Sequence, residues 1–128
     1  MIEIKEVLLE NREKIRNFCY INNVPFDEGA ISHVVLDSNN ILGVSQIKVE
    51  NGVGEIITIF VKEEFRNMGL GDGLLKMQIN FCYRNSIGFI KVKKGLNDGF
   101  FQRVGFVEDG EYLVLDVQAF YANFRCQQ

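Results

Sequence analysis

The sequence VKEEFRNMGLGDGLL, residues 61–75, determines most of what can be expected of the fold. An apolar, strand-like run ends at Val61, glycines follow at positions 69, 71 and 73, and apolar residues then recur at 70, 74, 77 and 81. That last spacing is typical of an amphipathic helix. The stretch therefore predicts a strand, a tight turn and a helix in succession.

The start of such a helix is a candidate site for an anion. The first amide groups of a helix have no partner within it, and the aligned peptide dipoles add a partial positive charge. Glycines allow a ligand to approach the backbone closely, and Arg66 adds a full charge. The spacing matches neither a P-loop nor a dinucleotide fingerprint. Two interpretations remain at this point, a phosphate-binding turn and a purely structural helix cap.

The segments on either side of this junction indicate the fold class. Strands are expected at residues 2–8, 31–37, 41–50, 53–61, 87–93, 106–107 and 112–117. Helices are expected over 10–20, from residue 70 onward and over 97–103. Asn51-Gly52 between two alternating runs is a strong hairpin signal. Because helices interrupt strands without regular alternation, we expect one α+β domain over 1–128, with a mixed, mostly antiparallel central sheet flanked by helices.

Composition argues against several classes of protein. Fourteen Lys and Arg against 17 Asp and Glu give a net charge of −3, which disfavours a nucleic-acid binder. Three separated cysteines without a CxxC pair disfavour a disulfide framework or a zinc site. The only histidine, His33, is interpreted as a solvent-facing strand residue or a substrate-side base. The charged start and the lack of a long apolar run predict a cytoplasmic protein without metal or membrane partners.

Two segments resemble the GNAT superfamily of N-acetyltransferases. The sequence RNMGLG, residues 66–71, matches that superfamily's R/Q-x-x-G-x-G/A motif, and FQRVGF, residues 101–106, is similar to its later aromatic-x-x-x-Gly-Phe segment. The resemblance covers most of the chain and implies acetyl-CoA as donor, with the diphosphate on the backbone of the turn and pantetheine along the preceding strand. The cofactor-binding residues so implied are Ile59, Phe60, Val61, Arg66, Asn67, Met68, Gly69, Leu70, Gly71, Asp72 and Phe101.

Acetyl transfer to an amine also needs a group that removes a proton from the ammonium form. Glu55 is the candidate, because some members of the superfamily carry a general-base glutamate on this strand. Strand alternation places Glu55 on the same face as Ile59. A solvated charge at the start of the strand is the alternative.

The acid that would protonate the leaving thiolate is missing from its usual place. Many members of the superfamily have a tyrosine where this chain has Phe101, and phenylalanine has no proton to donate. Water or another tyrosine would have to replace it. Otherwise the chain binds CoA without efficient turnover.

Three functions are therefore carried forward. The first is an acetyl-CoA-dependent N-acetyltransferase acting on a primary amine of a small molecule, peptide or protein. The alternative is a non-catalytic acyl-CoA-binding or regulatory module. The third is a structural interaction domain with neither activity. The acceptor site is expected in loops at 20–30 and 118–128, and the apolar segment 112–124 is suited to a homodimer contact.

Overall fold

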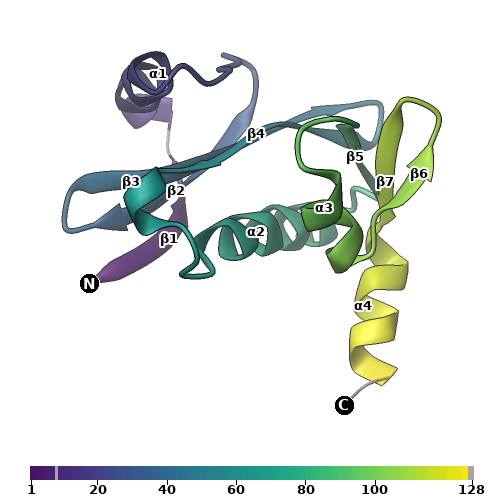
Figure 1. Ribbon diagram of the computed structural model, residues 1–128. Coiled ribbons are helices and arrows are strands. Elements are labelled where there is room, and N and C mark those ends of the chain that lie inside the picture. Colours follow the sequence, from purple (N-terminus) through teal and green to yellow (C-terminus); the bar gives the residue numbers. More distant parts are fainter. Residues whose placement is uncertain (8, 127–128) are drawn as a thin grey trace. The chain divides into compact units, whose positions relative to one another are not determined.

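The computed structural model describes residues 1–7 and 9–126, and its strands form one mixed sheet (Figure 1). The strand order is β1-β2-β3-β4-β5-β7-β6. The strands β4 and β5 pair in parallel, and the pairs β1–β2, β2–β3, β5–β7 and β6–β7 are antiparallel. The elements are β1 (Ile2–Glu6), η1 (Leu9–Asn11), α1 (Arg12–Ile21), β2 (Ile31–Asp37), β3 (Asn40–Glu50), β4 (Val53–Val61), η2 (Glu63–Phe65), α2 (Leu70–Arg84), β5 (Phe89–Lys93), α3 (Asp98–Val104), β6 (Val107–Asp109), β7 (Tyr112–Asp116) and α4 (Val117–Cys126).

The contacts of the chain group it into two compact units. Unit 1 comprises the described residues of Met1–Lys48 together with Ile57–Gln78, and unit 2 comprises Val49–Ile56 and the described residues from Ile79 onward. The strand β4 and the helix α2 each contribute to both units.

Unit 1 has an apolar cluster on each face of its strands. Figure 1 shows α1 on one side of β1, β2 and β3 and the beginning of α2 on the other. On the α1 side, Ile15 and Cys19 pack with Val34 and Val44. On the α2 side, the cluster consists of Val35, Leu42, Val61, Leu70 and Leu74. Burial on both faces explains why the buried residues form continuous runs, 32–35 in β2 and 42–47 in β3, rather than alternating with exposed ones.

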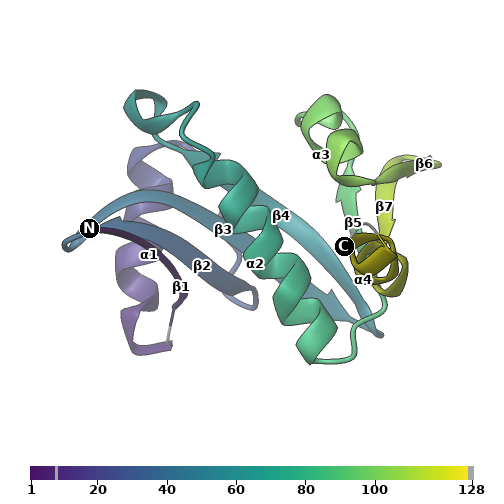
Figure 2. The ribbon, with the colours of Figure 1, turned by 90° about the horizontal axis from the view of Figure 1, so that it is seen from below.

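Unit 2 is built around the pairing of β5 with β7 (Figure 2). Ile90 lies opposite Leu115 and Val92 lies opposite Leu113, and all four side chains are buried. The short strand β6 forms the outer edge beside β7. This arrangement leaves the alternate residues of β5, including Lys91, partly accessible.

The predicted fold class is confirmed. The sheet is mixed and mostly antiparallel, and every predicted strand and helix is present, with bounds that differ by a few residues. The assignment of 1–128 to one domain stays a prediction. None of the helices among the described residues combines the length and apolar character that a membrane crossing needs.

The prediction of a loop at 118–128 is wrong for the described residues, because α4 occupies this region. Asp116 Oδ1 accepts a hydrogen bond from the Ala119 amide at 3.0 Å, which caps the helix. Tyr121 packs against Tyr83 with ring centroids 4.2 Å apart, and its hydroxyl accepts a hydrogen bond from Asn80 at 3.2 Å. Apolar residues at 117, 120, 121 and 124 have helical spacing, and this pattern is the sequence signal for α4.

The interpretation of His33 as a solvent-facing residue is also wrong, because its side chain is completely buried. His33 lies between Glu6 of β1 and Ser45 of β3 in the strand register. It is on an inner strand, and it shares the strand face of Val35, which packs with Leu70 and Leu74 of α2.

Gly43 of β3 is expected to be essential for the geometry of the β4 end. A Cβ atom at this position would lie 2.8 Å from the Phe60 carbonyl oxygen and 3.2 Å from Val61 Cγ2. Since the first of these is a backbone atom, Gly43→Ala should displace the strand and lower the free energy of unfolding by about 1–3 kcal/mol. Urea denaturation measures this. The matched control is Gly88→Ala, whose new methyl would meet nothing within 4 Å, and equal midpoints for the two variants would contradict the prediction.

Candidate functional site

The strand β4 leads into α2 through the turn of residues 62–69. This turn lies entirely within unit 1. The Lys62 amide donates to the Leu42 carbonyl at 2.9 Å, so the turn begins from a fixed point on β3. The short helix η2 follows, and Asn67 and Gly69 then adopt positive φ angles of 67° and 78°. These two left-handed residues reverse the chain and direct it into α2. Glycine and asparagine tolerate this conformation better than other residues.

The end of the turn and the first residues of α2 present a series of backbone amides without a hydrogen-bond acceptor among the described residues. The Gly73 amide donates to the Gly69 carbonyl at 3.0 Å, which is the first bond of α2. In the described part of the chain, no backbone or side-chain acceptor is assigned to the amides of residues 67–72. Residues 67–69 are exposed, and a Cβ at Gly69 would meet nothing within 4 Å. The turn therefore has the unpaired donors and the free space that an anion at a helix N-terminus requires.

Arg66 is held beside this turn. Its Nε donates to the Val61 carbonyl at 2.8 Å, and its guanidinium carbon lies 5.6 Å from the centre of the Phe60 ring. The side chain thus binds the last carbonyl of β4. Its remaining N–H groups are available for a phosphate, because Arg66 is an exposed residue.

Asp72, in the first turn of α2, lowers the positive potential at this site. Its carboxylate forms an ion pair with Lys76 one turn later, with Oδ2 and Nζ 2.9 Å apart. A negative charge in the first turn stabilises the helix but repels an anion, and Lys76 offsets part of that repulsion. Any contact of Asp72 with a bound phosphate would therefore be through its backbone amide.

The end of β4 uses its side chains for the core of unit 1. Ile59 and Val61 pack with the cluster on the α2 side, and Phe60 packs on the α1 side, where its ring meets Phe18 edge-on at 6.0 Å. What residues 59–61 can offer to a ligand is therefore their backbone. The parallel pairing of β4 with β5 ends at Glu55↔Lys91, and β4 continues from there to Val61.

Glu55 and Phe101 belong to unit 2, whereas the other predicted site residues belong to unit 1. Glu55 is half-buried and lies opposite Lys91 in the parallel register. Lys91 Nζ lies 4.5 Å from the centre of the Tyr112 ring, which is a cation–π contact. The alternation predicted for β4 is confirmed, since residues 53, 55, 57 and 59 are half-buried and 54, 56 and 58 are buried.

Phe101 is part of an aromatic cluster in unit 2. It is 3% exposed and meets Phe100 and Phe106 edge-on, with ring centroids 5.1 Å and 5.3 Å away. Gly105, with a φ of 124°, ends α3 and lets Phe106 follow directly. Among the described residues, the Phe101 side chain therefore packs in the interior of unit 2.

Two polar residues that the sequence pattern does not mark, Gln46 and Thr58, hold the segment 22–30. Gln46, which is fully buried, accepts a hydrogen bond from the Asp27 amide at 2.8 Å and donates to the Asp27 carbonyl at 3.1 Å. Thr58 donates to the Pro25 carbonyl at 2.7 Å. An expected variable loop is thus fixed to β3 and β4. No local signal marks either residue, because the bonds join positions 19 and 33 residues apart.

The buried cysteines do not supply a nucleophile. Burial raises the pKa of both the Cys19 and the Cys82 thiols to about 11, so both stay protonated at neutral pH. Cys82 is fully buried, as expected for a residue on the apolar face of α2. Within the described residues, no group of three or more His, Cys, Asp or Glu side chains is placed to hold a metal ion.

Comparisons with known proteins agree on one family. The model of the acetyltransferase (GNAT) domain matches residues 11–116. No curated protein matches the sequence.

Solved structures share the fold at low sequence identity. An acetyltransferase of the GNAT family from Staphylococcus aureus is 17% identical with a TM-score of 0.70, and the match covers 91% of this chain and 99% of that one. The ribosomal-protein-S18-alanine N-acetyltransferase of Escherichia coli is 13% identical with a TM-score of 0.70, covering 91% and 94%. The PaiA N-acetyltransferase of Thermoplasma acidophilum, in complex with coenzyme A, is 13% identical with a TM-score of 0.67, covering 89% and 96%.

Proposed function

Because the chain belongs to the GNAT superfamily of acetyltransferases, we propose that it transfers the acetyl group of acetyl-CoA to a primary amine. The observation that supports this best is the turn before α2, where the amides of residues 67–72 are open and Gly69 leaves free space. A diphosphate is the anion that fits a row of successive backbone donors.

In this proposal, the backbone of the turn holds the diphosphate through Asn67, Met68, Gly69, Leu70, Gly71 and Asp72, with Arg66 adding a charged donor. The backbone of Ile59, Phe60 and Val61 pairs with the amide groups of the pantetheine arm. The side chains of these three residues are occupied in the core of unit 1, which keeps the strand rigid. The bound donor supplies the acetyl thioester.

The rate enhancement is expected to come mainly from holding the amine and the thioester together. We assign the proton removal to Glu55, acting directly or through a water molecule. The carboxylate takes one proton from the ammonium form of the acceptor. Nitrogen of the neutral amine then bonds to the acetyl carbon, the carbon–sulfur bond breaks, and the second proton leaves nitrogen for water. The partly accessible position of Glu55 on β4 supports this role.

The leaving thiolate is protonated by water or by a tyrosine, because Phe101 has no proton to give and is packed between two other phenylalanines. The assignment of Phe101 to the cofactor site is a proposal based on the resemblance of residues 101–106 to the superfamily. A thiolate is a good leaving group, so a missing acid should slow the reaction rather than prevent it.

The acceptor is proposed as an amine of a small molecule, a peptide or a protein. The E. coli structure is that of an enzyme named for an alanine of a ribosomal protein. Other similar structures are of N-acetylglutamate synthase, an enzyme named for an acetylated amino acid. These names support keeping both protein and small-molecule amines as proposed acceptors. A homodimer contact through 112–124 and a cytoplasmic location stay predictions.

The experiment that tests this function is an acetylation screen. Acetyl-CoA is incubated with the chain and with amines of different charge, including peptide N-termini and lysine. Release of CoA thiol and a product heavier by one acetyl group are measured together. We expect acceptor-dependent thiol release with saturation in acetyl-CoA.

A second function, that of a non-catalytic acyl-CoA-binding module, is favoured by Phe101 alone. It predicts calorimetric binding of acetyl-CoA without thiol release for any amine in the screen. If calorimetry showed no binding of CoA, both functions would be excluded.

A further inference from the structure

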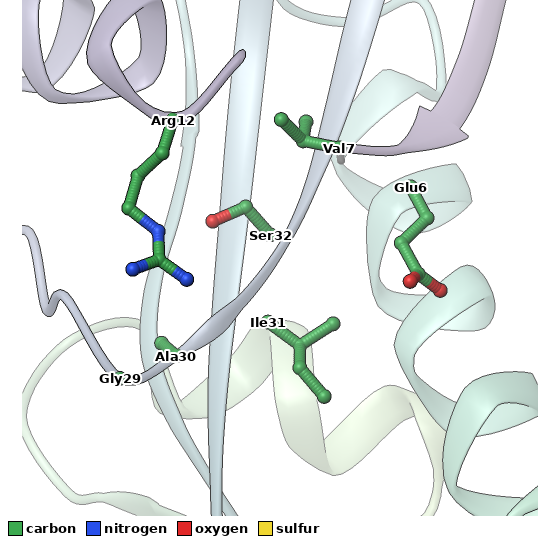
Figure 3. Close-up of a pocket in the computed structure, with 7 residues that line it drawn as sticks. All are labelled: Glu6, Val7, Arg12, Gly29, Ala30, Ile31 and Ser32. Atoms are coloured by element: carbon green, nitrogen blue, oxygen red, sulfur yellow. The ribbon is translucent and has the colours of Figure 1, made fainter. Parts of the chain in front are cut away.

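We propose that unit 1 contains a second ligand site, a cavity that binds a small carboxylate through Arg12 and Ser32 (Figure 3). The cavity has a volume of about 230 Å³ and is lined by Glu6, Val7, Arg12, Gly29, Ala30, Ile31 and Ser32. The cavity lies beside residues 29–32, at the start of β2. The turn of residues 62–69 is instead bonded through the Lys62 amide to Leu42 of β3, which lies beside the end of β2. The two sites are therefore separate, and this inference does not depend on the proposed function.

Arg12 is the cation available for the ligand. In the described part of the chain, its Nη1 approaches Glu28 Oε2 only to 3.9 Å, which is too far for a hydrogen bond. Glu28 is instead held by Arg16, whose Nη2 and Nε lie 2.6 Å and 2.8 Å from Oε1. Arg16 also lies over the ring of Phe26 at 5.8 Å. Arg16 is thus hydrogen-bonded to Glu28, whereas Arg12 forms only a long ion pair with the same carboxylate, so its N–H donors can bind another acid in competition with Glu28.

Ser32 supplies a second donor from the wall of the cavity. It is 8% exposed, and its Oγ accepts a hydrogen bond from Gln46 Nε2 at 3.0 Å. No acceptor for its hydroxyl proton is assigned among the residues described, so that proton can be donated into the cavity. Figure 3 shows the Ser32 hydroxyl on the side of the strand that faces Arg12. Gln46 and the pairing of the Val7 amide with the Ser32 carbonyl at 2.9 Å fix its position.

The lining determines the class of ligand. A planar guanidinium and a nearby hydroxyl match the two oxygens of a carboxylate. Val7, Ala30 and Ile31 offer apolar surface for a short hydrocarbon tail. Glu6, which Figure 3 shows on the far side of Ile31 from Arg12, disfavours anions of higher charge such as phosphate. The volume is below the range of about 300–1,000 Å³ typical of pockets for drug-sized ligands, so the ligand is small.

The test is a titration of the isotopically labelled chain with propionate, followed by the amide NMR signals. We expect saturable shifts at residues 29–32. Arg12→Gln should weaken binding at least tenfold, because it removes the charged hydrogen bonds. Glu28→Gln should strengthen binding roughly two- to fivefold, because it removes the competing carboxylate. A variant that merely unfolds cannot bind more tightly, so the two opposite changes separate binding from folding.

Lys14→Gln is the matched control, since it removes one positive charge from an exposed position of the same helix. It should leave the dissociation constant unchanged. The proposal is overturned if propionate gives no saturable shift, if its shifts are confined to residues 67–72, or if Arg12→Gln binds as well as Lys14→Gln does. It is overturned equally if inorganic phosphate binds these residues more tightly than propionate.

Discussion

Replacing Gly69 by alanine is expected to weaken CoA binding by about 10- to 100-fold. The φ angle of this residue is 78°, a conformation that costs an alanine about 1–2 kcal/mol. If the turn relaxes to relieve the strain, the amides of residues 67–72 no longer point to one place. Loss of one hydrogen bond to a charged phosphate is worth about 1.5–3 kcal/mol, which corresponds to this change in affinity. Calorimetry with CoA measures it.

Gly52 provides a matched control for this variant. Its φ angle is 77°, and a Cβ there would also meet nothing within 4 Å, but it lies in the β3–β4 hairpin. Gly52→Ala therefore introduces a similar backbone strain away from the turn. Both variants should unfold at similar urea concentrations, and only Gly69→Ala should lose affinity for CoA. Equal affinities would mean that the turn is a structural helix cap and not the diphosphate site.

Replacing Glu55 by glutamine is expected to lower kcat/KM for acetyl transfer by about 10²–10⁴-fold at neutral pH, the usual contribution of a positioned general base. Glutamine keeps the size and most of the polarity of the side chain but cannot accept the proton of an ammonium ion. The affinity for CoA should stay the same, because the residue is not assigned to the diphosphate or pantetheine contacts. Steady-state kinetics across a range of pH, together with calorimetry, separate the two effects.

Glu111→Gln is the control for the loss of one negative charge in unit 2. Glu111 is exposed in the turn between β6 and β7, and its carbonyl accepts a hydrogen bond from the Lys94 amide at 3.1 Å. This variant should retain full activity. If Glu55→Gln also retained full turnover at every pH, the assignment of Glu55 as base would be wrong, whereas the CoA site would be unaffected.

The strand–turn–helix junction could be predicted because its determinants are local. Glycines at 69, 71 and 73, followed by apolar residues with helical spacing, predict a helix that begins after a tight turn, and α2 begins at Leu70. The membership in the GNAT superfamily was likewise carried by residues 66–71 and 101–106, and the family match over 11–116 confirms it.

Other features depended on contacts between distant segments. The burial of His33 follows from the position of β2 inside the sheet, and the fixation of the segment 22–30 follows from Gln46 and Thr58. Neither can be read from a window of neighbouring residues, since the partners are far apart in the sequence. The helix α4 is a different case, because the apolar spacing of 117, 120, 121 and 124 is a local signal for a helix, although residues 118–128 are expected as a loop.

The sequence by itself therefore determined the family, the order of the strands and main helices up to β7, and the unpaired amides at the start of α2, because helix starts and left-handed glycines act within a few residues. The tertiary structure decided which polar side chains are buried, that Glu55 lies opposite Lys91, and that Glu28 is hydrogen-bonded to Arg16 but forms only a long ion pair with Arg12. These depend on strand register and on competition for Glu28, and long-range packing sets both.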